Sequence, residues 1–177
     1  MAPAGSTFNY NSGSTALLGL ILRKTSGKPI DELAKAELFG HLGIEDTQWQ
    51  RMPQGDPSAG GGLRIRPRDA AKIGQLVLNK GFWRGSRIVP AAWIGESIRA
   101  QNKGPASYLY GYQWWIGESE VKGRAVGWAG AFGWGGQRLI VIPELEMAVF
   151  FAAWMPRDMA FPERVLLTEH ILPAVIE

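Results

Sequence analysis

The sequence changes character at Tyr108, and this change limits the folds that the chain can adopt. Before it, apolar residues recur at helical spacing in segments that begin at proline or small hydroxyl residues and end at glycine. After it, short aromatic and β-branched runs alternate with glycine, proline and charged turns. Helices followed by antiparallel strands and a covering helix predict an α+β fold. We expect two parts of one domain, a mainly helical region over 1–107 and strands with a closing helix over 108–177.

Each expected helix carries an apolar side that we predict to be buried. The helices and their inward residues are 13–26 (Leu17, Leu18, Ile21, Leu22), 29–40 (Ile30, Leu33, Ala34, Leu38), 67–81 (Ile73, Leu76, Val77), one from Pro90 (Trp93, Ile94, Ile98) and 158–176 (Val165, Leu166, Ile171). Among the strands, the pair Trp114 and Trp115 could line a substrate site. Adjacent strand residues point to opposite faces, however, so at least one of them is expected in the core.

Composition excludes several classes of function. The 177 residues suffice for one compact domain, with 46% apolar and 20% charged residues, as in folded globular proteins. The net charge of +3 is scattered, so nucleic-acid binding is not expected. No segment is apolar enough to span a membrane, and residues 1–8 do not resemble a signal peptide. Cysteine is absent, and His41 and His170 lack ligand spacing, so we expect no metal and no cofactor. The cellular compartment stays open.

Tyr10 and Ser12 lie directly before the first expected helix, in the stretch FNYNSGST. A phenol held at a helix start can relay protons if its surroundings lower its pKa or link it to a hydrogen-bonded chain. The alternative is structural: Tyr10 packs against the helix, and Ser12 or Ser14 caps it. Spacing alone favours the structural alternative.

Two glycine-rich segments admit a structural and a functional interpretation. Glycines in the strand segment 127–144 could expose backbone amides to a developing oxyanion, or they could mark a bulged or twisted strand. The loop 58–62, which contains Gly60, lets the chain turn tightly and come close to another surface. For this loop the structural interpretation is favoured, with substrate contact at Gly60 as the alternative.

The order of these segments resembles a known family. YNSGSTALLGLILRKTSGKPIDELAKAELFGHLGIEDTQW, GGGLRIRPRDAAKIGQLVLNKGFWRGSRIVPAAW, YGYQWW and GWGGQRLIVIPELEMAVFF follow one another as in the later part of the serine β-lactamase-related hydrolases. That family includes class C β-lactamases, DD-peptidases, penicillin-binding proteins, family VIII esterases and 6-aminohexanoate-dimer hydrolases. The resemblance extends over nearly the whole chain and implies part of a β-lactamase/transpeptidase-like fold.

The resemblance implies roles for the tyrosine motif and for a glycine-rich strand. Tyr10 matches the tyrosine that exchanges a proton with the leaving group, and Ser12 stands where β-lactamases usually have asparagine and some esterases and amide hydrolases have serine. An ester or amide substrate is therefore favoured over a β-lactam. The Lys-Thr-Gly motif is absent, which removes the usual anchor for a penicillin carboxylate.

Two registers can replace that motif. Counting back without gaps from Pro143 gives Trp128-Ala129-Gly130, and matching the Gly-Gly-Gln sequence gives Trp134-Gly135-Gly136. The second register is preferred, because esterase-like relatives use Trp-Gly-Gly. It implies that the Trp134 N–H forms half of the oxyanion hole, with Gly135, Gly136 and Trp128 in contact with substrate; in the first register the donor is at Ala131.

The family's nucleophile motif, Ser-x-x-Lys at the start of a buried helix, finds one match here, Ser119 to Lys122. This match falls in a charged turn and follows the tyrosine motif, whereas in relatives the nucleophile precedes it. We therefore expect the chain alone to be inactive. It would be either the C-terminal portion of a serine hydrolase or a non-catalytic, truncated relative that binds a ligand or another chain. An uncovered apolar surface and an open strand edge would favour self-association or pairing with an N-terminal portion.

Overall fold

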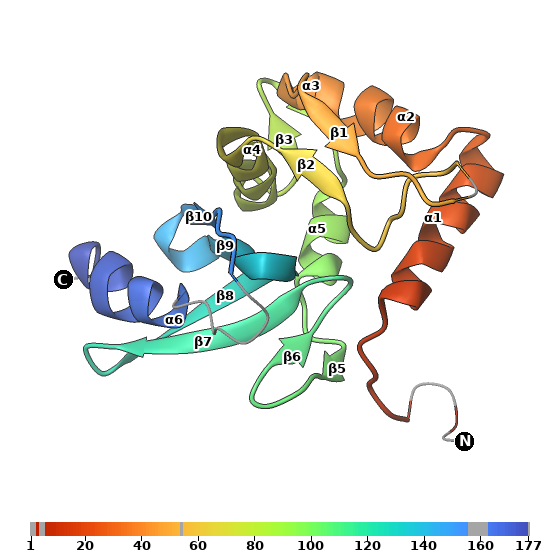
Figure 1. The fold of residues 1–177 in the computed structure, drawn as a ribbon. Coiled ribbons are helices and arrows are strands. Elements are labelled where there is room, and N and C mark those ends of the chain that lie inside the picture. Colours follow the sequence, from red (N-terminus) through yellow and green to blue (C-terminus); the bar gives the residue numbers. More distant parts are fainter. Residues whose placement is uncertain (1–2, 4–5, 54, 156–162, 177) are drawn as a thin grey trace. The chain divides into compact units, whose positions relative to one another are not determined.

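The computed structural model describes residues 3, 6–53, 55–155 and 163–176, and it confirms the α+β class (Figure 1). The chain forms two compact units, residues 1–69 and 70–177, which are described separately. The change of character predicted at residue 108 falls inside the second unit. Among the described residues no helix has the length and apolar character needed to cross a bilayer.

The first unit contains helices and a short hairpin. Its elements are α1 (Ser12–Ser26), α2 (Ile30–Ala34), a π-helical turn (Lys35–Phe39), α3 (Gly40–Leu42), β1 (Thr47–Trp49) and β2 (Leu63–Ile65). Helix α1 ends as the sequence predicts, at Gly27 in the left-handed conformation. The helical run from Ile30 passes the expected end at Gly40 and stops at Leu42, where Gly43 is left-handed.

The predicted buried face of α1 is wrong. Leu17 and Ile21 are 59% and 56% exposed, and Leu18 and Leu22 are also exposed. The buried residue of this helix is Gly19, where an added Cβ would lie 3.0 Å from the Cβ of Ala59. The large apolar residues occupy so much of the helix circumference that periodicity cannot select one face, and such a helix is typical of a protein interior.

The second unit holds the main sheet. Its elements are α4 (Pro67–Leu78, whose first three residues belong to the first unit), β3 (Phe82–Trp83), β4 (Ser86–Arg87), α5 (Ala91–Ser97), β5 (Asn102–Lys103), β6 (Leu109–Tyr110), β7 (Trp115–Val121), β8 (Arg124–Gly133), a 3-10 turn (Trp134–Gly136), β9 (Gln137–Ile142), a 3-10 turn (Pro143–Leu145), β10 (Met147–Phe151), α6 (Glu163–Val165), a π-helical turn (Leu166–Ile171) and a 3-10 turn (Leu172–Ala174). The predicted strands after Tyr108 are confirmed.

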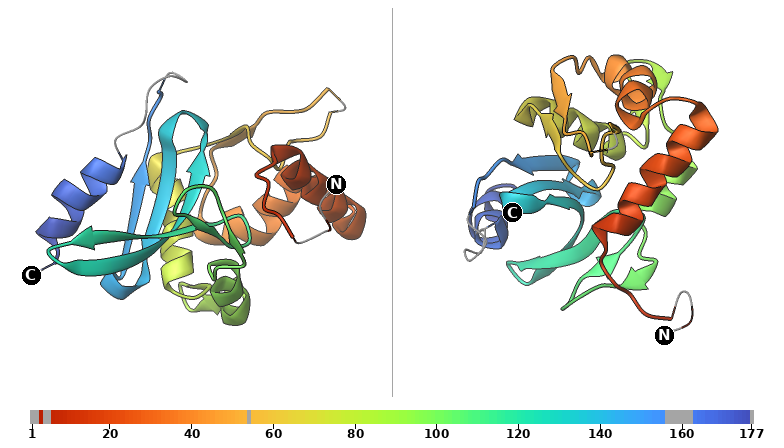
Figure 2. Two further views of the ribbon diagram at one scale, coloured as in Figure 1. Left: turned by 90° about the horizontal axis from the view of Figure 1, so that it is seen from below. Right: turned by 45° about the vertical axis from the view of Figure 1, so that its right-hand side comes forward.

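An antiparallel sheet in the order β10-β9-β8-β7-β6-β5 forms the middle layer of this unit, with helices on both faces (Figure 2, left). On one face, Ile140 and Val126 pack with Leu167 and Leu172 from the C-terminal helical segment. The core of the other face is formed by the residues Leu139 and Val141 of β9, Val77 of α4 and Ile94 of α5. Burial of these side chains, each contributing about 1.5–3 kcal/mol, stabilises the three layers.

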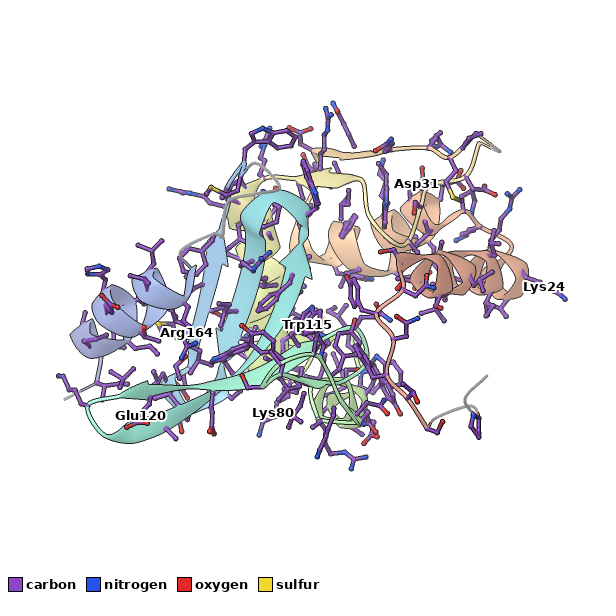
Figure 3. The ribbon with its side chains drawn as sticks, turned by 60° about the horizontal axis from the view of Figure 1, so that its bottom comes forward. Lys24, Asp31, Lys80, Trp115, Glu120 and Arg164 are labelled. Atoms are coloured by element: carbon purple, nitrogen blue, oxygen red, sulfur yellow. The ribbon has the colours of Figure 1, made fainter. Side chains whose placement is uncertain are left out.

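Aromatic rings fill the space above two strand glycines, Gly117 and Gly130. A Cβ at Gly117 would lie 2.4 Å from the Trp128 ring, and one at Gly130 would lie 2.4 Å from the Phe132 ring. Trp115, labelled in Figure 3, stacks on Phe132 with ring centroids 5.8 Å apart. Because β8 pairs with β9 in continuous register, these glycines make room for rings, and the bulge considered from the sequence is not present there.

Several residues that the sequence predicts to be buried are exposed in the structure. Trp93 is 54% exposed, because the short α5 turns Ile94 and Ser97 inward, and the Trp93 ring stacks on Tyr112 instead. In the closing helix Leu167 is buried, while Val165 is exposed. Residues 158–162 of that predicted helix lie outside the described residues. Trp114 and Trp115 face opposite clusters, as strand alternation predicts.

Candidate active site

Tyr10 and Ser12 mark the start of α1 in the first unit. Tyr10 is 52% exposed, and Ser12 is the first helical residue. The cap is Asn11, whose side-chain oxygen accepts a hydrogen bond from the Gly13 N–H at 2.7 Å. The predicted cap at Ser12 or Ser14 is therefore wrong. Sequence reasoning missed Asn11, although asparagine is among the preferred capping residues.

The loop 58–62 comes close to this helix start. A Cβ at Gly60 would lie 2.8 Å from the Ser12 carbonyl oxygen, so only glycine fits without a shift of the backbone. The Trp49 indole N–H donates to the carbonyl oxygens of Ser58 and Gly61, at 2.9 and 3.2 Å. The close approach expected of this loop is confirmed, and the loop is held beside α1 by strand β1.

Ser12 and Gly60 line the same cavity, whose volume is about 390 Å³. The other lining residues are Gln50, Arg51, Met52, Pro53, Ser58, Gly61 and Gly62. A volume of this order suits a small organic ligand, and polar hydroxyl and amide groups gather at its wall. The polar lining residues of the segment 50–58 were not singled out in the sequence, where only the glycines indicated a close approach.

An ion pair fixes one wall of this cavity. The Arg51 guanidinium donates to Asp31 at 2.7 Å and to the Gly55 carbonyl oxygen at 2.7 Å. Arg23 of α1 makes a further ion pair with Asp56. These two arginines tie the long loop between β1 and β2 to the first two helices.

In the second unit, strand β8 loses one of its two neighbours part-way along its length. Strand β7 pairs with β8 from Arg124 to Gly130, where Trp115 is the partner. The next residues, Ala131–Gly133, pair with β9 on the other side, and β7 contributes no partner to them. Backbone groups on that edge of Ala131–Gly133 can therefore face a ligand.

The two registers considered for the absent Lys-Thr-Gly motif have different structures. Trp128-Ala129-Gly130 lies on β8, immediately before the unpaired edge. Trp134-Gly135-Gly136 forms a 3-10 turn between β8 and β9, with Gly135 left-handed at φ 72°. The expectation that the preferred register lies on a strand is thus wrong for Trp134–Gly136, because glycines that permit a tight turn can resemble glycines of a strand edge.

Trp128 faces the core. Its ring covers Gly117, its side chain is 8% exposed, and its indole N–H donates to the Ser119 hydroxyl at 3.1 Å. With Tyr108, Phe132 and other residues it lines a small cavity of about 70 Å³. The Trp128 side chain therefore contributes to the core, and its contact with substrate stays a prediction.

Ser119 and Lys122 are both engaged in structural contacts. Ser119 is buried on β7 and accepts the Trp128 hydrogen bond, so its expected position in a turn is wrong. Lys122 lies beyond the end of β7, and its Nζ donates to the Ile176 carbonyl oxygen at 2.7 Å. Neither residue begins a buried helix, which is the setting that a serine and lysine pair needs for nucleophilic catalysis.

An antiparallel sheet with helices on both faces is the fold that solved β-lactamases share with this chain. The structure of a Mycobacterium bovis β-lactamase aligns with a TM-score of 0.77 at 19% identity, covering 98% of this chain and 66% of that one. The family model described as Beta-lactamase matches residues 1–162, and the chain belongs to this family. The resemblance found in the sequence is thereby confirmed.

Two relatives share more sequence with the chain. It is 26% identical over 164 residues to a 6-aminohexanoate-dimer hydrolase of Paenarthrobacter ureafaciens, covering 85% of this chain and 40% of the relative. A Bacillus anthracis structure, provisionally assigned as a 6-aminohexanoate-dimer hydrolase, is 32% identical to this chain and aligns with a TM-score of 0.77. The alignment covers 86% of this chain and 40% of that one. The chain thus spans about two fifths of the length of these relatives.

Proposed function

We propose that this chain supplies part of the active site of a serine hydrolase that cleaves an ester or amide bond through an acyl-serine. The observation that carries the proposal is the edge of β8, which loses β7 as a partner directly after Trp128-Ala129-Gly130. Backbone amides on such an edge can donate to the oxyanion of a tetrahedral intermediate. The proposed donor is the N–H of Trp134, which follows this edge, because Trp115 and Gly130 form a hydrogen-bonded pair and strand alternation then turns the N–H of Ala131 toward β9.

The tyrosine motif supplies the proton transfer in this proposal. A serine hydroxyl from a Ser-x-x-Lys sequence outside residues 1–177 gives its proton to the lysine of that sequence and attacks the carbonyl carbon, and the carbonyl oxygen becomes an oxyanion. The phenol of Tyr10 then donates a proton to the departing alcohol or amine, and Ser12 contacts the same substrate from the start of α1. In the second step water gives a proton to the Tyr10 phenolate and attacks the acyl-serine, and the serine oxygen leaves with the proton held by the lysine as the acid is released.

Similarity to the 6-aminohexanoate-dimer hydrolases favours a linear amide substrate over a β-lactam. The absence of the Lys-Thr-Gly sequence agrees with this, since the lysine that would anchor a penicillin carboxylate is missing. Linear amides and esters are therefore the substrates to test first, with nitrocefin as the β-lactam for comparison.

Complementation tests the proposal. The chain is co-expressed with the part of the Paenarthrobacter ureafaciens hydrolase that it does not match, and p-nitrophenyl acetate hydrolysis is measured. We expect hydrolysis only when both polypeptides are present. Tyr10→Phe should lower kcat by roughly 10²–10⁴-fold, whereas Tyr112→Phe, at another exposed tyrosine, should not. Full activity of Tyr10→Phe would contradict the assigned role.

A second candidate function is a non-catalytic module that binds another chain or associates with itself. The exposed apolar residues of α1 favour it, because a contiguous apolar surface of this kind marks an interaction site. Light scattering at increasing protein concentration distinguishes the candidates. A mass that stays monomeric at high concentration contradicts the self-associating module.

A further inference from the structure

Two neighbouring tryptophans of the second unit are exposed to an unusual degree. The side chains are Trp134, in the turn after β8, and Trp154, which follows β10, and they are 59% and 78% exposed. Their ring centroids lie 4.9 Å apart with the planes at 74°, an edge-to-face contact. Indole rings gain much from burial, so a pair that contacts each other and still faces solvent indicates a binding surface.

The backbone beneath the two rings is fixed. The Met155 N–H donates to the Gly135 carbonyl oxygen at 3.0 Å, and the Gln137 side-chain amide donates to the Ala153 carbonyl oxygen. A Cβ at Gly135 would lie 3.9 Å from the Trp154 ring, so this ring rests beside the turn. A ligand that covers the pair therefore meets two indoles whose main chains are already ordered, which lowers the entropic cost of binding.

The size of the pair suits a small molecule better than a protein. With ~250 Å² for a whole indole side chain, the two rings expose roughly 300 Å² together. A stable protein interface needs about 800 Å² from each partner. A chain of several methylene groups can cover the roughly 300 Å² that the two rings expose. Each methylene buried there contributes about 0.8 kcal/mol to binding.

A cation lies beside the pair, but its contacts are with the protein. Arg138, a cation on the next strand, donates to the carbonyl oxygens of Gly133 and Gln137 and lies 4.7 Å over the Phe132 ring. Its guanidinium is thus engaged by the protein. The surface formed by Trp134 and Trp154 is accordingly suited to a hydrocarbon chain.

We propose that Trp134 and Trp154 form a subsite for the unbranched hydrocarbon part of an ester or amide ligand. The proposal rests on the proposed function, because the N–H of Trp134, directly after the β8 edge Ala131–Gly133, would hold the ligand carbonyl. A carbonyl held there leaves its aliphatic chain beside the turn.

Binding of hexanamide to the intact 177-residue chain tests the subsite without any need for a nucleophile. We expect hexanamide, but not acetamide, to shift the indole N–H resonances of Trp134 and Trp154 in ¹H–¹⁵N spectra. Trp154→Ala should weaken hexanamide binding about tenfold, which corresponds to the loss of ~1.4 kcal/mol. The matched control is Trp93→Ala, at a tryptophan that is also exposed but stacks on Tyr112.

The outcomes separate this proposal from the proposed function. Equal binding of acetamide and hexanamide, or hexanamide binding that Trp154→Ala leaves unchanged, overturns the subsite. If hexanamide binds as expected but complementation yields no hydrolysis, the subsite stands and the catalytic proposal fails. If complementation succeeds and Trp154→Ala hydrolyses p-nitrophenyl hexanoate and acetate in the wild-type ratio, only the subsite fails.

Discussion

Helix α1 and the sheet of the second unit are both rich in apolar side chains, but only those of the sheet are covered. Val126, Ile140 and Leu172 are almost completely buried between the sheet and a helix, whereas Leu17 and Ile21 of α1 are more than half exposed. The difference shows that the sheet has a core of its own. Helix α1 has the composition of an interior helix, and we infer that it requires a covering surface from another polypeptide segment or another copy.

The largest expected effect compares the two regions directly. Ile140→Ala in the sheet should destabilise the chain by about 2–5 kcal/mol, because it opens a cavity between packed layers. Leu17→Ala on α1 should change the free energy of unfolding by less than about 0.5 kcal/mol, since its side chain is largely in solvent. Urea denaturation of both variants at one low protein concentration measures this. A large effect of Leu17→Ala would show that α1 is covered after all.

The next prediction concerns association. Replacing Leu17 and Ile21 by lysine removes apolar area from α1 and adds like charges, so any self-association through this face should weaken at least about tenfold. Sedimentation velocity over a range of concentrations gives the dissociation constant. The matched control is Phe82→Lys, at an exposed apolar residue of the second unit, and it should leave the dissociation constant unchanged. If the α1 variant and the Phe82 control have the same dissociation constant, a surface other than α1 is responsible for association.

A smaller effect is expected at the strand glycines. Gly117→Ala should cost about 1–3 kcal/mol, because its methyl group would overlap the Trp128 ring. Gly127→Ala, on the neighbouring strand β8, has open space around the new methyl group and serves as the control. Thermal unfolding followed by tryptophan fluorescence compares them. Equal melting temperatures would mean that the ring does not occupy the space above Gly117.

The smallest expected effect is electrostatic. Hydrogen bonds from Arg99 and Gln101 lower the pKa of Glu96 below its ordinary value of 4.5. Any stability that this contact contributes is therefore present above pH 4.5 and is lost as the pH falls through the lowered pKa of Glu96. Because the pair is exposed, Arg99→Ala should shift Tm at pH 7 by no more than about 2 °C. Calorimetry at pH 7 and pH 3 checks this, and a larger shift at pH 3 than at pH 7 would contradict the sign.

Much of the fold could be predicted from the sequence, because periodicity, proline and glycine reported local structure well. The ends of α1 and the strands from β7 to β10 agree with the pattern. The exposure of α1 could not be predicted, since periodicity assigns an apolar face but not the presence of a surface to cover it. Likewise, the glycines of Trp134–Gly136 could not be recognised as a turn, because a turn and an open strand edge both favour glycine.

For the candidate site, the sequence identified Tyr10 and Ser12 at a helix start and Gly60 in a loop that comes close to another surface, and the structure places Ser12 and Gly60 on one cavity. It did not identify Trp154, because an isolated tryptophan after a strand carries no spacing signal. Its relation to Trp134 depends on hydrogen bonds that join the turn after β8 to the segment after β10.

The most direct test is to find which serine becomes acylated. A fluorophosphonate is applied to the chain alone and to the chain combined with the Ser-x-x-Lys-bearing region of a relative, and the labelled residue is mapped by mass spectrometry. We predict that no serine within residues 1–177 is labelled in either sample, and that the serine of the added region is labelled only in the presence of this chain. Stoichiometric labelling of Ser119, or of any other serine of this chain, would contradict the account.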